Sequence, residues 1–168
     1  MAISKTAGSK FYVSSTPVDS DDFNVSDAAA LDLYEAISNW VEVGEVEDLG
    51  SHGDTSEEIT FTSIGDGRTR KQKGARNAGS KTVVVGRDPL DDGQQVLIEA
   101  QESTLNYAFK VEHNDARSQS HSNSVEYFIG LVLGEEVTQG QQNNVVRQTF
   151  PISINSKPIK VQSELISS

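Results

Sequence analysis

The 168-residue sequence contains no cysteine. Without thiols the chain can build neither a disulfide framework nor a thiolate metal site. No stretch approaches the ~20 continuous apolar residues that a transmembrane helix needs, and Met1–Lys5 opens no apolar segment of signal-peptide length. These absences predict a protein that folds in a reducing compartment, with neither a leader nor a membrane segment.

Apolar residues are also scarce, at 35% of the chain, below the average of globular proteins. A chain of this length fits one domain with a real core and little room for a second. We therefore predict a single domain over residues 1–168, with a thin core and long solvated loops.

Positive charge is missing from a long stretch near the N-terminus. Residues 17–58 hold thirteen carboxylates and no lysine or arginine. Residues 65–82 reverse the sign, with six cations against one carboxylate, so this segment carries +5 and the rest of the chain −16 of a total of −11. Such segregation favours head-to-tail contact between like molecules. The alternative is two solvated loops with biased charge.

Residue patterns that carry catalysis or metal binding are absent as well. The histidines, His52, His113 and His121, have no second ligand at a metal-binding spacing and are interpreted as structural or incidental. The acidic run from Asp19 fails the calcium-loop pattern, because Asn24 stands where the loop needs glycine. The chain has no phosphate-binding loop and no Gly-x-Ser-x-Gly elbow. We predict no catalytic residue, no metal ligand, no cofactor and no enzymatic activity.

Alternating apolar and polar residues predict that most of the chain is β-structure. Strands are expected at 10–14, 40–49, 59–64, 81–87, 105–112, 125–137, 145–155 and 158–164. One helix is expected at 94–103, while 26–39, which Ser26 or Asp27 could cap, is either a helix or an extended loop. The predicted fold is mainly β: a β-sandwich or partly closed barrel of seven or eight strands with one flanking helix.

The basic segment 65–82 buries almost nothing, so it is expected to be an extended loop or hairpin arm, or a loop disordered in the monomer. Its cations could contact phosphates. The stretch 68–76 has no aromatic residue on which bases could stack, and the whole chain is acidic. Conventional DNA binding is therefore not expected.

Several short motifs in a fixed order resemble the major tail tube proteins of long, non-contractile phage tails, the siphophage tail tube family. They are WVEVGEV at 40–46, DTSEEITF at 54–61, GDGRTRKQKGARNAG at 65–79 and RDP at 87–89. The C-terminal layout is also similar, with a core strand, a polar loop, NVV at 144–146 and a closing strand after Pro158. The similarity covers residues 40–161. The N-terminal part, residues 1–39, consists of one expected strand and an acidic variable segment, and within it residues 26–39 depart from the family pattern.

The resemblance implies a sandwich with a flanking helix, six copies per ring, and rings stacked into a hollow tube that conducts viral DNA into the host. It implies a virion protein of the tail, made and assembled in the host cytoplasm. The implied partners are further copies of the chain, the tape-measure protein, and the tail tip and tail terminator proteins, with double-stranded DNA passing transiently.

Two site hypotheses follow from the charge pattern and the resemblance. The basic arm is expected to stack rings by reaching an acidic surface of the adjacent ring, for example within residues 42–58, through Arg68, Arg70, Lys71, Lys73 and Arg76. The lumen is expected to be lined by carboxylates, because a basic wall would hold duplex DNA by its phosphates. Strand alternation offers Glu42, Glu45, Glu47, Glu112 and Glu126 as candidates.

Two other interpretations remain open. A ring-forming tube protein of a bacterial contractile injection or secretion system has a similar architecture, and discrete rings in solution would favour it. A ligand-binding β-sandwich, such as a carbohydrate-binding module, usually presents several exposed aromatic side chains on one face. Here most aromatic residues fall on core-facing strand positions or stand alone, like Trp40.

Overall fold

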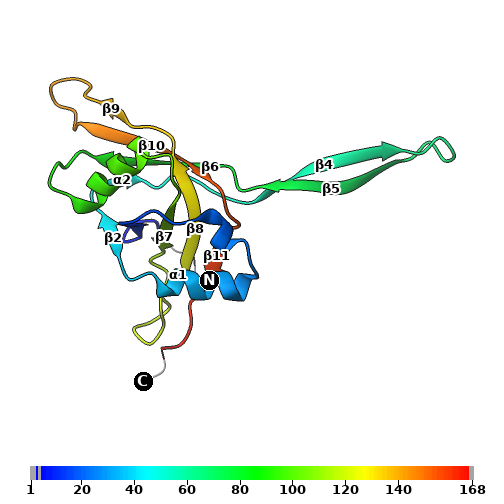
Figure 1. Cartoon of the computed structure of the whole chain (residues 1–168), viewed down its shortest axis with the longest axis horizontal. Helices are drawn as coiled ribbons and strands as arrows, with labels where there is room; N and C mark the ends of the chain where they lie inside the picture. The colour runs from blue at the N-terminus through cyan, green and yellow to red at the C-terminus, as the bar shows by residue number, and fades with distance from the viewer. Residues whose placement is uncertain (1–2, 4, 167–168) are drawn as a thin grey trace.

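The computed structural model describes residues 3 and 5–166, so the ends of the predicted domain, residues 1, 2, 4, 167 and 168, lie outside it. The described chain forms eleven strands, two α-helices and one 3-10 turn (Figure 1). The strands are β1 (Lys10–Ser14), β2 (Trp40–Val43), β3 (Val46–Asp48), β4 (Thr55–Thr62), β5 (Thr69–Asn77), β6 (Ser80–Gly86), β7 (Tyr107–Glu112), β8 (Val125–Val132), β9 (Glu136–Thr138), β10 (Arg147–Ile154) and β11 (Ile159–Val161). The helices are η1 (Ser20–Phe23), α1 (Asp27–Ala36) and α2 (Asp92–Glu102).

Nine strands form one antiparallel sheet in the order β2-β1-β7-β8-β10-β6-β3, with β11 paired to β8 and β9 to β10. The outermost strands of this order, β2 and β3, are consecutive in the chain and are separated only by Gly44 and Glu45. The sheet must therefore curl until its two edges approach each other. It stops short of a closed barrel, because β2 and β3 do not pair with each other.

The N-terminal end of α2 bridges the unpaired edges at β2 and β3, which we call the open corner. Asp91 caps α2 through the backbone N–H of Gln94, and its carboxylate also accepts the N–H of Gly44. The Gln94 amide donates to the carbonyls of Gly44 and Gly86, which belong to the two sides of the corner. The helix approaches β2 so closely that a Cβ on Gly93 would lie 2.3 Å from a β2 carbonyl oxygen.

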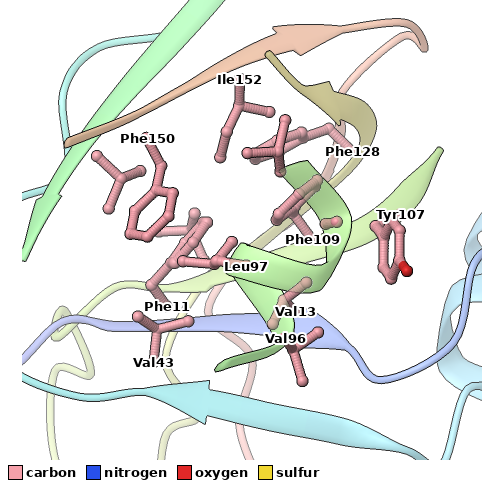
Figure 2. Packing of buried hydrophobic residues seen from close by; sticks show 14 of the residues in the cluster. Phe11, Val13, Val43, Val96, Leu97, Tyr107, Phe109, Phe128, Phe150 and Ile152 are labelled. Atoms are coloured by element: carbon pink, nitrogen blue, oxygen red, sulfur yellow. The ribbon is translucent and has the colours of Figure 1, made fainter. Parts of the chain in front are cut away.

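The main core lies between the curled sheet and α2 (Figure 2). Leu97 of α2 is fully buried among Phe11, Phe109 and Phe150 from three different strands. Aliphatic residues from β6 and β10 complete the cluster. Alternation places the strand side chains on one face of the sheet, so this face and one stripe of α2 supply the cluster except Ala78, which lies between β5 and β6.

A second, smaller cluster covers the outer face of the sheet. Tyr34 of α1 stacks on Tyr127 of β8 at a centroid distance of 5.1 Å, and its hydroxyl lies 3.3 Å from Ser156 Oγ. Ser26 caps α1 by accepting the N–H of Ala29. The segment 26–39, left open between helix and extended loop, is therefore helical over 27–36.

The predicted mainly β fold is confirmed, with differences in detail. There are eleven strands rather than seven or eight, because the basic segment pairs with residues 55–62 to form two strands and because two expected strands, 40–49 and 125–137, each divide in two. Two helices flank the sheet rather than one. The divisions fall at Gly44–Glu45 and at Gly134, where the sheet turns its corners.

Candidate assembly site

The most conspicuous feature is a two-stranded arm, β4 and β5, that projects far from the body (Figure 1). Every residue of β4 is exposed, and so is every residue of β5 except the half-buried Gly74. At ~3.3 Å per residue the eight residues of β4 extend ~26 Å. The basic segment is thus an ordered hairpin arm, one of the alternatives expected from the sequence.

Ion pairs within the arm neutralise much of its charge. Lys71 contacts Glu58 across the two strands at 3.3 Å, and Arg70 contacts Asp66 of the turn at 3.0 Å. Over residues 55–77, five cations face three carboxylates, which leaves the arm at +2 and the rest of the chain at −13 of the total of −11. All five cations predicted to stack rings, namely Arg68, Arg70, Lys71, Lys73 and Arg76, lie on the arm or its turn.

The pairing register gives the arm two chemically different faces. Residues directly opposite each other in an antiparallel pair point to the same side. Ile59 pairs with Gln72 and Phe61 with Arg70, so these four side chains share one face, which we call the apolar arm face. The other face carries threonines and lysines, among them Thr60 opposite Lys71. Ile59 and Phe61 are 53% and 66% exposed, although both are large apolar side chains.

A polar cluster fixes the base of the arm to the sheet. His52, on the linker between β3 and β4, is hydrogen-bonded to Glu126 of β8 through Nε2, and its Nδ1 lies 3.0 Å from Lys81 Nζ of β6. Its ring also packs on Phe128 at a centroid distance of 5.8 Å. Just beyond, Arg76 and Asp54 join the two strands of the arm at 3.4 Å. These contacts orient the arm relative to the body.

Burial perturbs this cluster electrostatically. Lys81 is 2% exposed, and desolvation lowers its pKa to about 8, partly opposed by the charges of Glu126 and Asp48. The hydrogen bond from His52 holds the pKa of Glu126 below its usual value, against desolvation, which raises it. A charged Lys81 can only donate, so His52 accepts at Nδ1 and carries its hydrogen at Nε2, toward Glu126.

The sequence analysis interpreted His52 as structural or incidental and missed its partners. One signal was present: Lys81 is in phase with Val83 and Val85, both buried on the core side of β6. Alternation could therefore have placed Lys81 inside. Nothing in the sequence could have paired it with a histidine 29 residues away.

The five carboxylates proposed for the lumen do not share one surface. Glu42 and Glu112 lie on the outer face of the sheet on either side of Tyr12, and their charges, after desolvation, help raise the pKa of Tyr12. Glu45 stands at the open corner, and Glu47 is paired with Arg147. Glu126 faces the other way, into the His52 cluster, and its side chain is only 15% exposed.

The described residues hold no group of three histidine or carboxylate side chains arranged to bind a metal ion. A cleft of about 830 Å³ opens beside the His52 cluster. Its acidic residues, Asp27, Asp54 and Glu126, all have cationic partners there. Among the described helices, none has both the length and the apolar character needed to span a bilayer.

Chains of similar fold occur in solved structures of tube and injection assemblies. A chain of the SPP1 tail tube matches with a TM-score of 0.60 at 13% identity, over 94% of this chain and 77% of that chain. A chain of the anti-feeding prophage baseplate, a six-fold symmetrised structure, matches with a TM-score of 0.64 at 12% identity, over 92% and 91%. A chain from the sheath/tube terminator structure of the PVC extracellular contractile injection system matches with a TM-score of 0.58 at 12% identity, over 71% and 86%.

No protein-family model matches the sequence, and no curated protein matches it. At such low identities the matches establish the fold: this chain has the fold of the SPP1 tail tube subunit. The predicted resemblance to tail tube proteins is confirmed at that level.

Proposed function

We propose that this chain is a structural, non-catalytic subunit that forms rings of six copies, and that the rings stack into the tail tube of a phage, the conduit for viral DNA. The observation that carries the proposal is the exposed arm on a body with the fold of a tail tube subunit. An isolated two-stranded ribbon is marginally stable in water. An ordered arm that exposes Ile59 and Phe61 therefore needs a surface to rest on.

A second copy of the chain suits the arm better than an unrelated partner, because the chain carries both charges. The arm is cationic and the body strongly anionic, so contact between the arm of one copy and the body of another is electrostatically attractive. A contact between two different surfaces of like molecules repeats without limit unless rotation closes it. Stacked rings need one contact that closes into a ring and a second contact that repeats from ring to ring.

The sheet borders supply the closing contact in this proposal. β2, β3, β9 and β11 each pair with one neighbour only. Free edges of this kind pair readily with strands of another molecule. Six copies per ring is proposed from the six-fold symmetry of the anti-feeding prophage baseplate, whose matching chain has the same fold.

Glu42 and Glu112 are the strongest candidates among the proposed lumen carboxylates, because both flank Tyr12 on the outer face of the sheet. An acidic wall repels the phosphates of duplex DNA and lets the DNA slide. Glu45 and Glu47 stay candidates at the corner of the sheet. Glu126 can contribute little to such a wall, because its side chain is only 15% exposed and is hydrogen-bonded to His52.

The proposal also includes the partner proteins of the tube and its location. A tube of set length needs a tape-measure protein inside it and tip and terminator proteins at its ends. The protein would be made and assembled in the host cytoplasm and would act in the virion tail.

A tube of a contractile injection or secretion system is the second candidate, because two of the matched structures come from such assemblies. Electron microscopy of the purified protein distinguishes the two candidates. Long tubes, or monomers that polymerise when an initiator complex is added, support the tail tube, and isolated rings support the injection system.

The arm is tested with the triple variant Arg68→Glu, Arg70→Glu and Lys71→Glu. We expect a folded protein that forms no tubes, because the arm would then repel the acidic body. The matched control reverses three exposed cations outside the arm, Lys5, Lys10 and Arg117, and should still polymerise. Normal tubes from the arm variant would refute the role of the arm.

A further inference from the structure

The apolar arm face has a counterpart at the opposite end of the molecule. Three exposed apolar residues lie near the end of β6, the end of β9 and the start of β10, and we call them the distal patch: Leu90, Val137 and Val145. Val137 is opposite Gln148 of β10, and a Cβ on Gly86 would touch the Val145 side chain. Figure 1 shows β9, the start of β10 and the start of α2 at the end of the body away from the arm.

β6 links the two surfaces along one axis. Two residues separate it from the arm, so it starts at Ser80, and it ends at Gly86 near the distal patch. At ~3.3 Å per residue its seven residues extend ~23 Å, similar to the ~26 Å of the arm. A molecule that extends its arm along this axis therefore meets the far end of the next molecule rather than its flank.

Charge makes the distal end a suitable partner for the arm. Seven carboxylates surround the patch, from the corner, the start of α2 and β9: Glu45, Glu47, Asp88, Asp91, Asp92, Glu135 and Glu136. The two cations in the same segments are Arg87 and Arg147, and Arg147 is already paired with Glu47. The distal end thus combines exposed apolar residues with an excess of negative charge, and the arm combines exposed apolar residues with an excess of positive charge.

The structure also removes part of the acidic surface expected to receive the arm. Of the range 42–58, Glu57 and Glu58 belong to β4, and Glu58 is paired with Lys71 of the same arm. Asp54 is paired with Arg76 at the arm base. Glu45 and Glu47 of that range lie at the distal end, where Glu47 is paired with Arg147 and Glu45 stands beside it.

We infer that the apolar arm face of one copy docks on the distal patch of a second copy, with Ile59 and Phe61 on the apolar residues and Arg70 among the carboxylates. This inference rests on the proposed tube function and names the surface that receives the arm. Arm-to-arm docking is disfavoured, because it would place the Arg70 side chains of two copies together. Arm-to-distal docking is heterologous and does not close, which is the geometry of a stack.

Cross-linking tests the contact directly, since the chain contains no native cysteine. The variant Phe61→Cys/Val137→Cys should give a ladder of disulfide-linked oligomers when assembled tubes are oxidised. The matched control Thr60→Cys/Val137→Cys places the thiol on the other arm face and should give no ladder. An equally strong ladder from the control, or no ladder from the Phe61 variant in intact tubes, would overturn the inference.

Assembly strength provides a second readout. We expect Ile59→Ala/Phe61→Ala to raise the concentration needed for tube formation by about tenfold or more, the equivalent of ~1.4 kcal/mol of binding free energy. Thr60→Ala/Thr62→Ala, on the other face, should leave it unchanged, and an unchanged concentration for the Ile59/Phe61 variant would contradict the docking. If the wild type forms no polymer even with tail partners, the proposed function itself fails, whereas tubes without the predicted cross-link refute only the docking surface.

Discussion

Replacing Lys81 by methionine should change the pH dependence of stability in a way that few substitutions can. Lys81 is a cation with 2% exposure and, among the described residues, its only close polar partner is the His52 ring. Burial lowers its pKa to about 8 from 10.5. Between these values the unfolded chain binds a proton at this site and the folded chain does not, so wild-type stability should rise as pH increases through this window.

The size of the effect follows from the separation of the two pKa values. At about 1.4 kcal/mol per pH unit, ionisation of Lys81 costs the folded state about 3 kcal/mol below pH 8. Lys81→Met removes that cost and loses one hydrogen bond, worth about 1 kcal/mol. The variant should therefore be more stable than the wild type by about 2 kcal/mol at pH 7, and less stable by about 1 kcal/mol near pH 10.5.

Urea unfolding followed by Trp40 fluorescence measures this difference at pH 7, 8, 9 and 10, at protein concentrations below assembly. The four tyrosines, whose pKa values burial raises, also lower stability at high pH. They are present in both proteins, so their contribution cancels in the difference. Lys71→Met, at an exposed arm position, is the control and should show no such trend. A stability difference between Lys81→Met and wild type that stays constant from pH 7 to 10 would refute the reasoning.

Three further changes test the corner and the arm base. Gly93→Ala should destabilise the protein by about 1–3 kcal/mol, because the added methyl group collides with the β2 backbone. The control is Gly53→Ala, where an added methyl group would have nothing within 4 Å. Equal melting temperatures of the two variants in thermal unfolding would contradict the close approach of α2 to β2. Asp91→Ala should lower the free energy of unfolding by about 1–3 kcal/mol, since both the α2 cap and the link to the corner are lost; Asp92→Ala, one residue on, should have a smaller effect in urea unfolding. Glu126→Gln should reduce the loss of unfolding free energy at acid pH. In the wild type, the lowered pKa of Glu126 adds stability above the pKa of an unfolded glutamate, and this stability is lost as pH falls through the pKa of Glu126 in the folded protein. An unchanged acid limb would show that the His52 contact contributes no stability.

The predictions that held depended on local signals. Ser26 caps α1, as its place before the helical pattern indicated. Alternation in 105–112 indicated a strand with Tyr107, Phe109 and Val111 inside, which the structure confirms, although Leu105 is exposed and Ala108 is buried on the other face. The charge reversal at residues 65–82 marked the segment that leaves the body. Each of these signals acts between residues a few positions apart, so it can be read in a single sequence.

Contacts between residues far apart in the sequence could not be predicted from such local signals. The sequence could not show that Glu126 faces His52 rather than a solvent wall, because that depends on the linker crossing the end of β8. It also could not show that Glu58 pairs with Lys71 of the same arm, since the register of β4 and β5 decides it.

The sequence by itself determined the strands, the helix caps and an acidic body with a basic segment, because periodicity, capping and charge are properties of neighbouring residues. Only the tertiary structure decided that the sheet curls, that a buried lysine and a histidine anchor the arm, and that the two exposed apolar surfaces lie at opposite ends of β6. Those features depend on which distant strands pair and in what register, and that choice is made by the packing of the whole core.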